Sequence, residues 1–296
     1  MPNPISILNR AYHRSLDLAL RVDRRSALNS EREGGEAGPN IAGELFAAVR
    51  EMKADAYDPS CACFDYAVLP TRESYSRYRD CSARLRAFDP TSLRTRGERL
   101  AFWINLYNAL VIDAVVAFGI RASVREDGGF FRRAAYIIGG RRYSADDIEH
   151  GILRGNRPHF HPAIWLPQFA PDDPRLALSV RPPDPRVHCA LVCASQSCPP
   201  IAAYEAARVD DQLDLACAAF VNGGVRLEGG RSAPSGRRVC LSPIFRWYRR
   251  DFGGREGVRE FLLRYLDAGE AREALENGSP SGSVGFYPYD WSLNAI

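Results

Sequence analysis

Apolar residues recur at intervals of three and four over residues 5–28, which predicts a helix near the start of the chain. The same spacing predicts helices over residues 41–52 and 72–88. Between the first two helices, residues 30–40 read SEREGGEAGPN, a polar, glycine-rich sequence typical of a mobile loop. We therefore expect residues 1–55 to form a helical N-terminal appendage with a mobile loop, and residues 56–296 to form a single α+β domain.

Residues 98–118, which read ERLAFWINLYNALVIDAVVAF, are apolar on most faces and predict a helix buried at the centre of the domain. Asn105 and Asn108 share one face of this helix. Because a buried amide is costly unless its polar atoms find partners, these asparagines either pin neighbouring backbone or line a polar cavity. The apolar stretch is shorter than the roughly 20 residues that a membrane span needs, so we expect no membrane partner.

The remaining pattern predicts short strands and helices. Two strands, 135–138 and 141–143, flank a Gly139–Gly140 turn, and a capping box formed by Ser144 and Asp147 begins a helix that runs to residue 154. We also expect a buried strand at 187–192, helices at 210–220, 246–251 and 258–266, and pairing of strand 225–228 with strand 238–241. The fold class is thus α+β, with a buried central helix and a small, mostly antiparallel sheet.

Composition and charge narrow the classes of protein. With 46% hydrophobic and 25% charged residues the chain is globular, and its net charge of +3 requires no nucleic-acid partner. Lys53 is the single lysine among 39 basic residues, an arginine excess typical of bacterial high-GC coding. Schiff-base or P-loop chemistry would therefore depend on Lys53, which follows no glycine-rich loop. Charges throughout residues 1–30 indicate no secretory signal, so a cytoplasmic location is expected.

The window 184–201, DPRVHCALVCASQSCPPI, contains three of the eight cysteines and one of the five histidines. Either Cys193 or Cys198 could be a nucleophile, with His188 as its general base and Glu149 as the carboxylate that orients the imidazole. An imidazole beside a thiol lowers the thiol pKa and supplies thiolate at neutral pH. Spacing alone does not choose between the two thiols.

Other interpretations of the window remain open. Zinc could bind Cys193, Cys198 and His188, with His150 as a fourth ligand, but this spacing is not that of a standard zinc motif, so we expect no metal and no cofactor. Cys193 and Cys198 could instead form a reversible disulfide. The residues could also belong to a core strand with buried thiols.

Five ordered motifs resemble domain-of-unknown-function family 547. They read FWINLYNALVIDAVV at 102–116, DDIEHGILR at 146–154, the cysteine window at 184–201, LSPIFRWYRRDF at 241–252 and YDWSLN at 289–294. The family pattern matches at Trp103, Asn105, Asn108, Glu149, His150, His188, Cys193, Ser197 and Cys198. It departs at Cys189, where an aromatic residue is usual, and at Val192 and Ala194, where asparagine and glycine are expected.

The resemblance implies no assigned activity, although eukaryotic members joined to glutaredoxin-like, DEP or leucine-zipper segments imply redox or signalling contexts. We predict a cysteine-dependent acyl-transfer or hydrolytic enzyme acting on a small-molecule or acyl substrate. Its residues are Cys193 as the first-choice nucleophile and Cys198 as the second, His188 as base, Glu149 as orienting group, His150 nearby, and Asn105 or Asn108 as oxyanion donors. The alternative is a non-catalytic interaction or thiol-redox module, and a protein partner could bind the N-terminal appendage.

Overall fold

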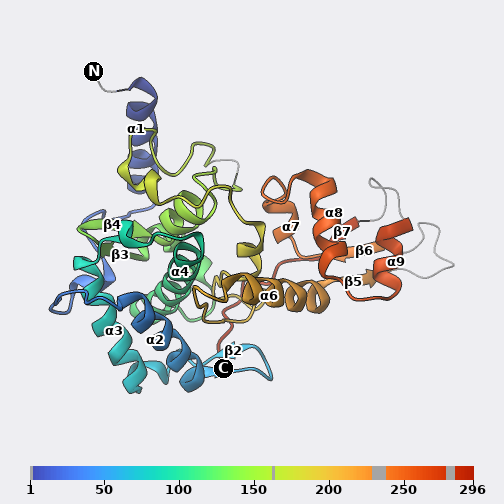
Figure 1. Ribbon diagram of the computed structural model, residues 1–296, viewed down its shortest axis with the longest axis horizontal. Helices are drawn as coiled ribbons and strands as arrows, with labels where there is room; N and C mark the ends of the chain where they lie inside the picture. The colour runs from blue at the N-terminus through green and yellow to red at the C-terminus, as the bar shows by residue number, and fades with distance from the viewer. Residues whose placement is uncertain (1–2, 162–163, 229–237, 278–283) are drawn as a thin grey trace. The chain divides into compact units, whose positions relative to one another are not determined.

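The computed structural model describes residues 3–161, 164–228, 238–277 and 284–296, which form an α+β fold of helices and small sheets (Figure 1). Two compact units share the chain. The first unit contains residues 1–184, 191–209 and 291–296, and the second contains residues 185–190 and 210–290. The predicted boundary between an appendage at 1–55 and a domain at 56–296 stays a prediction.

The first unit is mainly helical. Its helices are α1 (Pro4–Ala19), α2 (Ile41–Ala56), α3 (Glu73–Arg84), α4 (Arg96–Phe118), α5 (Phe130–Arg133) and a π-helix (Asp147–Leu153). Its strands are β1 (Tyr57–Asp58), β2 (Cys63–Phe64), β3 (Ala135–Ile138) and β4 (Arg141–Ser144). The pairs β1–β2 and β3–β4 are antiparallel, and the predicted hairpin around Gly139–Gly140 is confirmed.

Helix α4 forms the core of the first unit. A capping box between Thr95 and Glu98 begins it, and Gly119 in the left-handed conformation ends it. By length and composition α4 could cross a membrane, but 89% of its most apolar stretch is buried within the protein. Since α2 and the π-helix pack against α4, the predicted buried central helix is confirmed.

Helix α1 turns its polar face inward. Its buried residues are Ser6, Asn9, His13 and Asp17, whereas Ile5, Leu8 and Leu18 are exposed. Asn9 Nδ2 donates a hydrogen bond to the carbonyl of Pro167, and the His13 ring lies 2.8 Å from the same oxygen. The helical spacing at 5–28 thus identifies a helix, which ends at Ala19, but the face that the unit buries is the polar one.

The second unit combines a small sheet with helices. It contains α6 (Val209–Gly224), β5 (Arg226–Glu228), β6 (Arg238–Leu241), α7 (Ile244–Trp247), α8 (Gly254–Tyr265), α9 (Glu270–Asn277) and β7 (Val284–Phe286). Strand β6 pairs antiparallel with β5, as predicted, and parallel with β7. The turn between β5 and β6, residues 229–237, lies outside the described residues.

Candidate functional site

The cysteine window does not contain the predicted strand. Residues Pro185–Cys189 form a 3₁₀-helix, and the Ala190 N–H donates to the Val187 carbonyl. Proline favours this outcome because its fixed φ suits the first position of a helical turn and its ring removes a donor that a strand would use. The prediction of a strand at 187–192 was wrong, and so was the alternation of side chains that it implied.

In the loop that follows, several hydrogen-bond donors lie around the sulfur atom of Cys198. The backbone N–H of Cys193 donates to Cys198 Sγ at 2.9 Å, and the N–H of Ser195 lies 3.4 Å from the same atom. Ser195 Oγ lies 3.3 Å from Cys198 Sγ and 3.2 Å from Cys193 Sγ. The loop therefore brings Cys193 and Cys198 together, with Ser195 between the two thiols.

These contacts change the acidity of Cys198. Burial by itself raises the pKa of a thiol, because it disfavours the thiolate. At Cys198 the hydrogen bonds from the side chains and backbone of Cys193 and Ser195 outweigh burial and lower the pKa to about 6. Cys193 and Cys198 are both partly exposed as residues, and a thiolate at Cys198 is the nucleophilic form of the thiol.

The backbone around Cys193 is held from two directions. Asn108 Oδ1 accepts a hydrogen bond from the Val192 N–H at 2.9 Å, and Ala194 takes a left-handed conformation with φ of 62°. The resemblance leads us to expect glycine at position 194, and glycine would take this φ without steric cost. Ala194 therefore takes a conformation that the expected glycine would take more easily.

The C-terminal segment supports the same loop. Ser195 and Leu293 form an antiparallel bridge, the Gln196 N–H donates to the Ser292 carbonyl, and the Asn294 N–H donates to the Ala194 carbonyl. The motif YDWSLN thus contributes backbone to the thiol loop.

Tyr66 is a further residue beside the thiols. Its hydroxyl donates to Asn294 Oδ1 at 2.8 Å, and its pKa is raised well above the ordinary value by burial and then by the proximity of Cys198 and Cys193. Tyr66 is therefore held as a neutral hydroxyl next to the two sulfur atoms.

The contacts of Asn105 and Asn108 show whether these asparagines of α4 pin neighbouring backbone or line a polar cavity. Its Nδ2 donates to the Tyr204 carbonyl at 2.7 Å, and its Oδ1 accepts from the Tyr204 N–H at 2.8 Å. Together with the bond from Val192 to Asn108, this pair shows that both amides pin neighbouring backbone. Their proposed role as oxyanion donors stays a prediction.

His188 lies in the second unit. Its Nε2 is 2.9 Å from Asp251 Oδ2, and its ring stacks on Tyr248 with centroids 3.9 Å apart. Only 2% of the His188 side chain is exposed. Asp251, which sequence reasoning missed, supplies a carboxylate to this imidazole. An imidazole bound to a carboxylate in this way has a fixed tautomer and orientation.

Glu149 and His150 belong to the π-helix of the first unit. Tyr107 Oη donates to Glu149 Oε2 at 3.1 Å, while Glu149 Oε1 lies 3.5 Å from His150 Nδ1. The predicted capping box is present, because the Ser144 N–H donates to Asp147 Oδ2 and the Asp147 N–H donates to Ser144 Oγ. The helix it begins is a π-helix, a form that occurs often at functional sites. The role predicted for Glu149 toward His188 stays a prediction.

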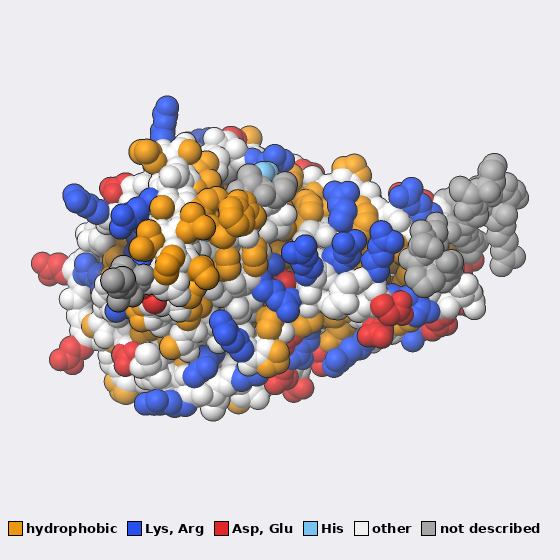
Figure 2. Space-filling model, turned by 90° about the horizontal axis from the view of Figure 1, so that it is seen from above, with side chains coloured by type: hydrophobic (Ala, Val, Ile, Leu, Met, Phe, Trp, Pro, Cys, Tyr) orange, Lys and Arg blue, Asp and Glu red, His pale blue; other side chains and the backbone are white. Residues whose placement is uncertain are grey.

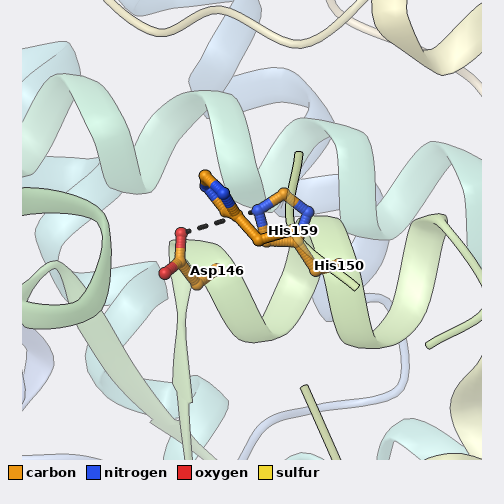
Figure 3. Close-up of side chains that lie close together, drawn as sticks. All are labelled: Asp146, His150 and His159. Carbon is orange, nitrogen blue, oxygen red and sulfur yellow. Dashed lines mark ion pairs between the residues drawn. The ribbon is translucent and has the colours of Figure 1, made fainter. Parts of the chain in front are cut away.

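Asp146 and His150, which are buried, form a group with the partly exposed His159, and the ligand atoms of the three all lie within 4.8 Å of one another (Figure 3). One carboxylate and two imidazoles are a donor set that zinc accepts. However, Arg154 Nη1 lies 2.7 Å from His150 Nδ1, and a guanidinium can only donate. The neutral His150 ring must then carry its proton on Nε2, the atom that faces Asp146 at 3.9 Å. That proton blocks a metal bond while the Arg154 contact is present.

The electrostatic surroundings of this group also disfavour a cation. Arg132 Nη1 lies 3.7 Å from Asp146 Oδ2. Burial and the nearby arginines lower the pKa of His159 to about 3, so its ring is neutral, the form that binds metals, whereas burial raises the pKa of Asp146 to about 7 and favours its protonated form. The group therefore resembles a desolvated polar cluster more than a cation site, and we derive no chemistry through a metal.

The structure thus brings together some of the predicted residues. Cys193 and Cys198 share one loop, Asn108 holds the backbone before that loop, and Glu149 lies beside His150. All of these belong to the first unit, whereas His188 belongs to the second. Ser195, Tyr66 and Asp251 were not predicted. Only Ser195 had a sequence signal, since a serine between two cysteines of a tight loop can reach both thiols.

Comparison with known proteins supports the resemblance that the motifs carry. Residues 90–221 match a family model described as "Protein of unknown function, DUF547". No curated protein and no solved structure matches the chain. The match includes α4, the π-helix and the thiol loop.

Proposed function

Because residues 90–221 belong to family DUF547, whose function is not known, we propose a function from the thiol site itself: a cysteine-dependent acyl-transfer or hydrolytic enzyme. One observation carries the proposal. Cys198 Sγ accepts hydrogen bonds from the backbone N–H groups of Cys193 and Ser195, and its pKa is lowered to about 6. A partly exposed thiolate at neutral pH is the feature shared by thiol nucleophiles.

Cys198 is the preferred nucleophile in this proposal, ahead of Cys193. Its sulfur adds to the carbonyl carbon of an acyl donor, the leaving group departs and takes up a proton, and the acyl group is carried as a thioester until water or a second nucleophile removes it. In this proposal the two N–H groups that contact the sulfur of Cys198 also donate to the oxyanion formed on the acyl carbon. His188 as the base, the acyl substrate and the cytoplasmic location stay predictions.

The test is site-resolved alkylation followed by acylation. Iodoacetamide is applied over a pH series, and peptide mass spectrometry follows each cysteine separately. Cys198 should be modified with a midpoint near pH 6, and Ser195→Ala should move that midpoint upward because one donor is lost. Cys81 is the matched control, since burial raises its thiol pKa to about 12.

Acylation then tests the enzyme itself. Incubation with activated esters and thioesters should leave an acyl group on Cys198, which Cys198→Ser removes and Cys81→Ser retains. His188→Gln should slow acylation if His188 is the base. Acylation that persists in Cys198→Ser, or a Cys198 that stays inert below about pH 8, would show that the proposal is wrong.

The redox alternative also has an observation in its favour, because the Cys193 thiol is among the hydrogen-bond partners of Cys198. A low-pKa thiol beside a second cysteine is the arrangement of a redox sensor with its resolving thiol. In a redox module, mild peroxide would join Cys193 to Cys198 with loss of two hydrogens, and acyl donors would leave no adduct. The same mass spectra therefore separate the two functions.

A further inference from the structure

A concave pocket of about 480 Å³ lies in the first unit, a volume within the range of small-molecule sites. Its walls come from the polar face of α1, from β4 with the turn before it, and from residues 168–175. The arginines that line it are Arg10, Arg24, Arg132, Arg141, Arg142 and Arg175. Three aspartates line it as well, which leaves three positive charges in excess.

The aspartates of the pocket are already paired. Asp17 accepts from Arg132, with Nη2 and Oδ1 2.5 Å apart, and lies 3.5 Å from Arg24. Arg175 lies 3.2 Å from Asp147 and 2.8 Å from Asp173. These ion pairs account for the three carboxylates. Arg10 pairs with Asp172, outside the lining, at 2.6 Å, so the two arginines of β4 remain without a carboxylate among the described residues.

Arg141 and Arg142 have no carboxylate within 4.0 Å in the described part of the chain. Arg142 is held by backbone oxygens instead, with Nε donating to the Ser26 carbonyl and Nη2 to the Arg132 carbonyl, each at 2.9 Å. Its pKa is lowered by burial, which Asp147 and Asp17 oppose. A partly buried guanidinium without an anionic partner is costly.

Arg132 also has a buried hydrogen-bond donor that the described residues do not satisfy. Its residue exposure is 7%, and among the described residues its Nη1 has no hydrogen-bond partner, with Asp146 Oδ2 lying 3.7 Å away. Buried donors in native proteins are almost always satisfied by protein, water or ligand.

We propose that this pocket binds a phosphate group, carried either by a soluble phosphate ester or by a lipid headgroup. The excess charge, the unmatched guanidinium groups of Arg141 and Arg142, and the planar fork geometry of arginine all suit a doubly charged tetrahedral oxyanion. The proposal also explains why α1 turns His13 and Asp17 inward, since these residues, with the exposed Arg10, line one wall of the pocket.

The outer face of α1 bears on the source of the phosphate. Ile5, Leu8 and Leu18 are 64%, 57% and 80% exposed, and Trp165 is 60% exposed. In Figure 2, which views the molecule from the side where α1 rises in Figure 1, hydrophobic side chains gather on this part of the surface. An apolar helix face with tryptophan and arginine close by is also the pattern of helices that lie on a membrane surface.

The experiment measures the binding of two ligands to the chain of 296 residues at constant ionic strength. Inorganic phosphate is titrated by calorimetry, with chloride of equal ionic strength as the blank. Sedimentation then compares vesicles of phosphatidylcholine with and without phosphatidic acid. The test variant is Arg24→Gln with Arg141→Gln, because Arg24 is largely exposed and Arg141 is exposed, so neither change removes a buried contact. The matched control is Arg208→Gln with Arg255→Gln, two exposed arginines outside the pocket.

We expect the test variant to bind its ligand roughly tenfold more weakly than wild type, since charge-assisted hydrogen bonds are lost, while the control binds as wild type does. Binding of inorganic phosphate assigns the pocket to soluble phosphate esters. Binding only to vesicles with phosphatidic acid assigns it to a lipid headgroup and overturns the expectation of no membrane partner. The proposal fails if neither ligand binds, or if the test and control variants lose affinity equally.

Discussion

At the scale of single residues, the acidity of Cys198 depends on a few short contacts. The Cys193 N–H and Ser195 approach one sulfur atom from within five residues of chain, so no distant element is needed to make the thiolate. The energy that favours this thiolate is also energy that favours the folded state, because the unfolded chain has lost those donors. The pKa shift can therefore be measured through stability as well as through reactivity.

The sign of this linkage follows from the lowered pKa. The folded pKa of about 6 lies below the value of roughly 8.5 for an unfolded thiol, so the stabilisation is complete above pH 8.5 and lost as pH falls through 6. Cys198→Ser should cost up to about 3 kcal/mol more at about pH 8.5 than at about pH 5.5. Urea unfolding at both pH values measures it. Cys81→Ser should show a much smaller trend in the opposite direction, because the folded thiol, with a pKa of about 12, stays neutral while the unfolded thiol begins to ionise at about pH 8.5. The same small trend for Cys198→Ser would contradict the linkage.

Ala194 makes a second residue-scale prediction. An L-residue in the left-handed region costs roughly 1–2 kcal/mol, and glycine removes this cost while adding some entropy to the unfolded chain. Ala194→Gly should therefore stabilise the protein by about 0.5–1 kcal/mol, read as a higher thermal midpoint. Ala67→Gly, at an exposed residue with ordinary φ, should lower the midpoint. If both changes destabilise equally, the backbone at position 194 is not strained.

At the scale of elements, α4 fixes the backbone of neighbouring segments through the hydrogen bonds of its asparagines. Asn105 forms two hydrogen bonds with the backbone of the buried Tyr204, so Asn105→Ala would remove the amide that binds both this N–H and this carbonyl. We expect a loss of roughly 2–4 kcal/mol in the free energy of unfolding, measured by denaturant titration. Asn277→Ala, at an exposed position of α9, should change it by less than about 0.5 kcal/mol. A small effect at Asn105 would mean that water replaces the amide.

The elements that the sequence predicts well are those with local signals. The glycine pair identifies the β3–β4 turn, the Ser144–Asp147 capping box begins the π-helix, and the apolar run identifies α4. The strand predicted at 187–192 fails because a short apolar run does not distinguish a strand from a buried turn, and Pro185 favours the turn.

The contacts of the candidate site were less predictable. Proximity in sequence brought Cys193 and Cys198 to attention, but the direction of each N–H toward Cys198 depends on a left-handed residue at 194 that no pattern indicates. Asp251 lies 63 residues from His188, and the polar inner face of α1 depends on which element covers it. Such pairings come from tertiary packing, which a single sequence does not encode in its periodicity.

At the scale of the whole molecule, one family segment contributes to both units. The matched residues 90–221 include α4 and the π-helix in the first unit, and residues 185–190 with most of α6 in the second. The thiol loop at 191–198 belongs to the first unit and follows directly on the 3₁₀-helix of His188. The effects of substitutions in the two units on stability and on thiol reactivity can therefore be compared within one family segment.

In the first unit, the neighbouring residues Asp146 and Asp147 should change the free energy of unfolding with pH in opposite directions. Burial raises the pKa of Asp146 to about 7, so the folded state holds its proton more tightly than the unfolded chain, and this stability is lost as pH rises from about 4 to 7. At Asp147 burial is outweighed by Arg175, Gln168 and the Ser144 N–H, which lower the pKa to about 2. Its stability is present above about pH 4 and lost as pH falls toward 2.

The matched pair of variants is Asp146→Asn and Asp147→Asn. Relative to wild type, Asp146→Asn should become more stable as pH rises from about 4.5 to 8, by up to about 4 kcal/mol, because the cost of a buried charge is removed. Asp147→Asn should be destabilising throughout that range, because it removes the charge that pairs with Arg175 and leaves one acceptor oxygen for two donors, the Ser144 N–H and Gln168 Nε2. Denaturant titrations at several pH values measure both. If Asp146→Asn shows no pH trend, the Asp146 carboxylate is solvated or paired more strongly than its 3.7 Å distance from Arg132 implies.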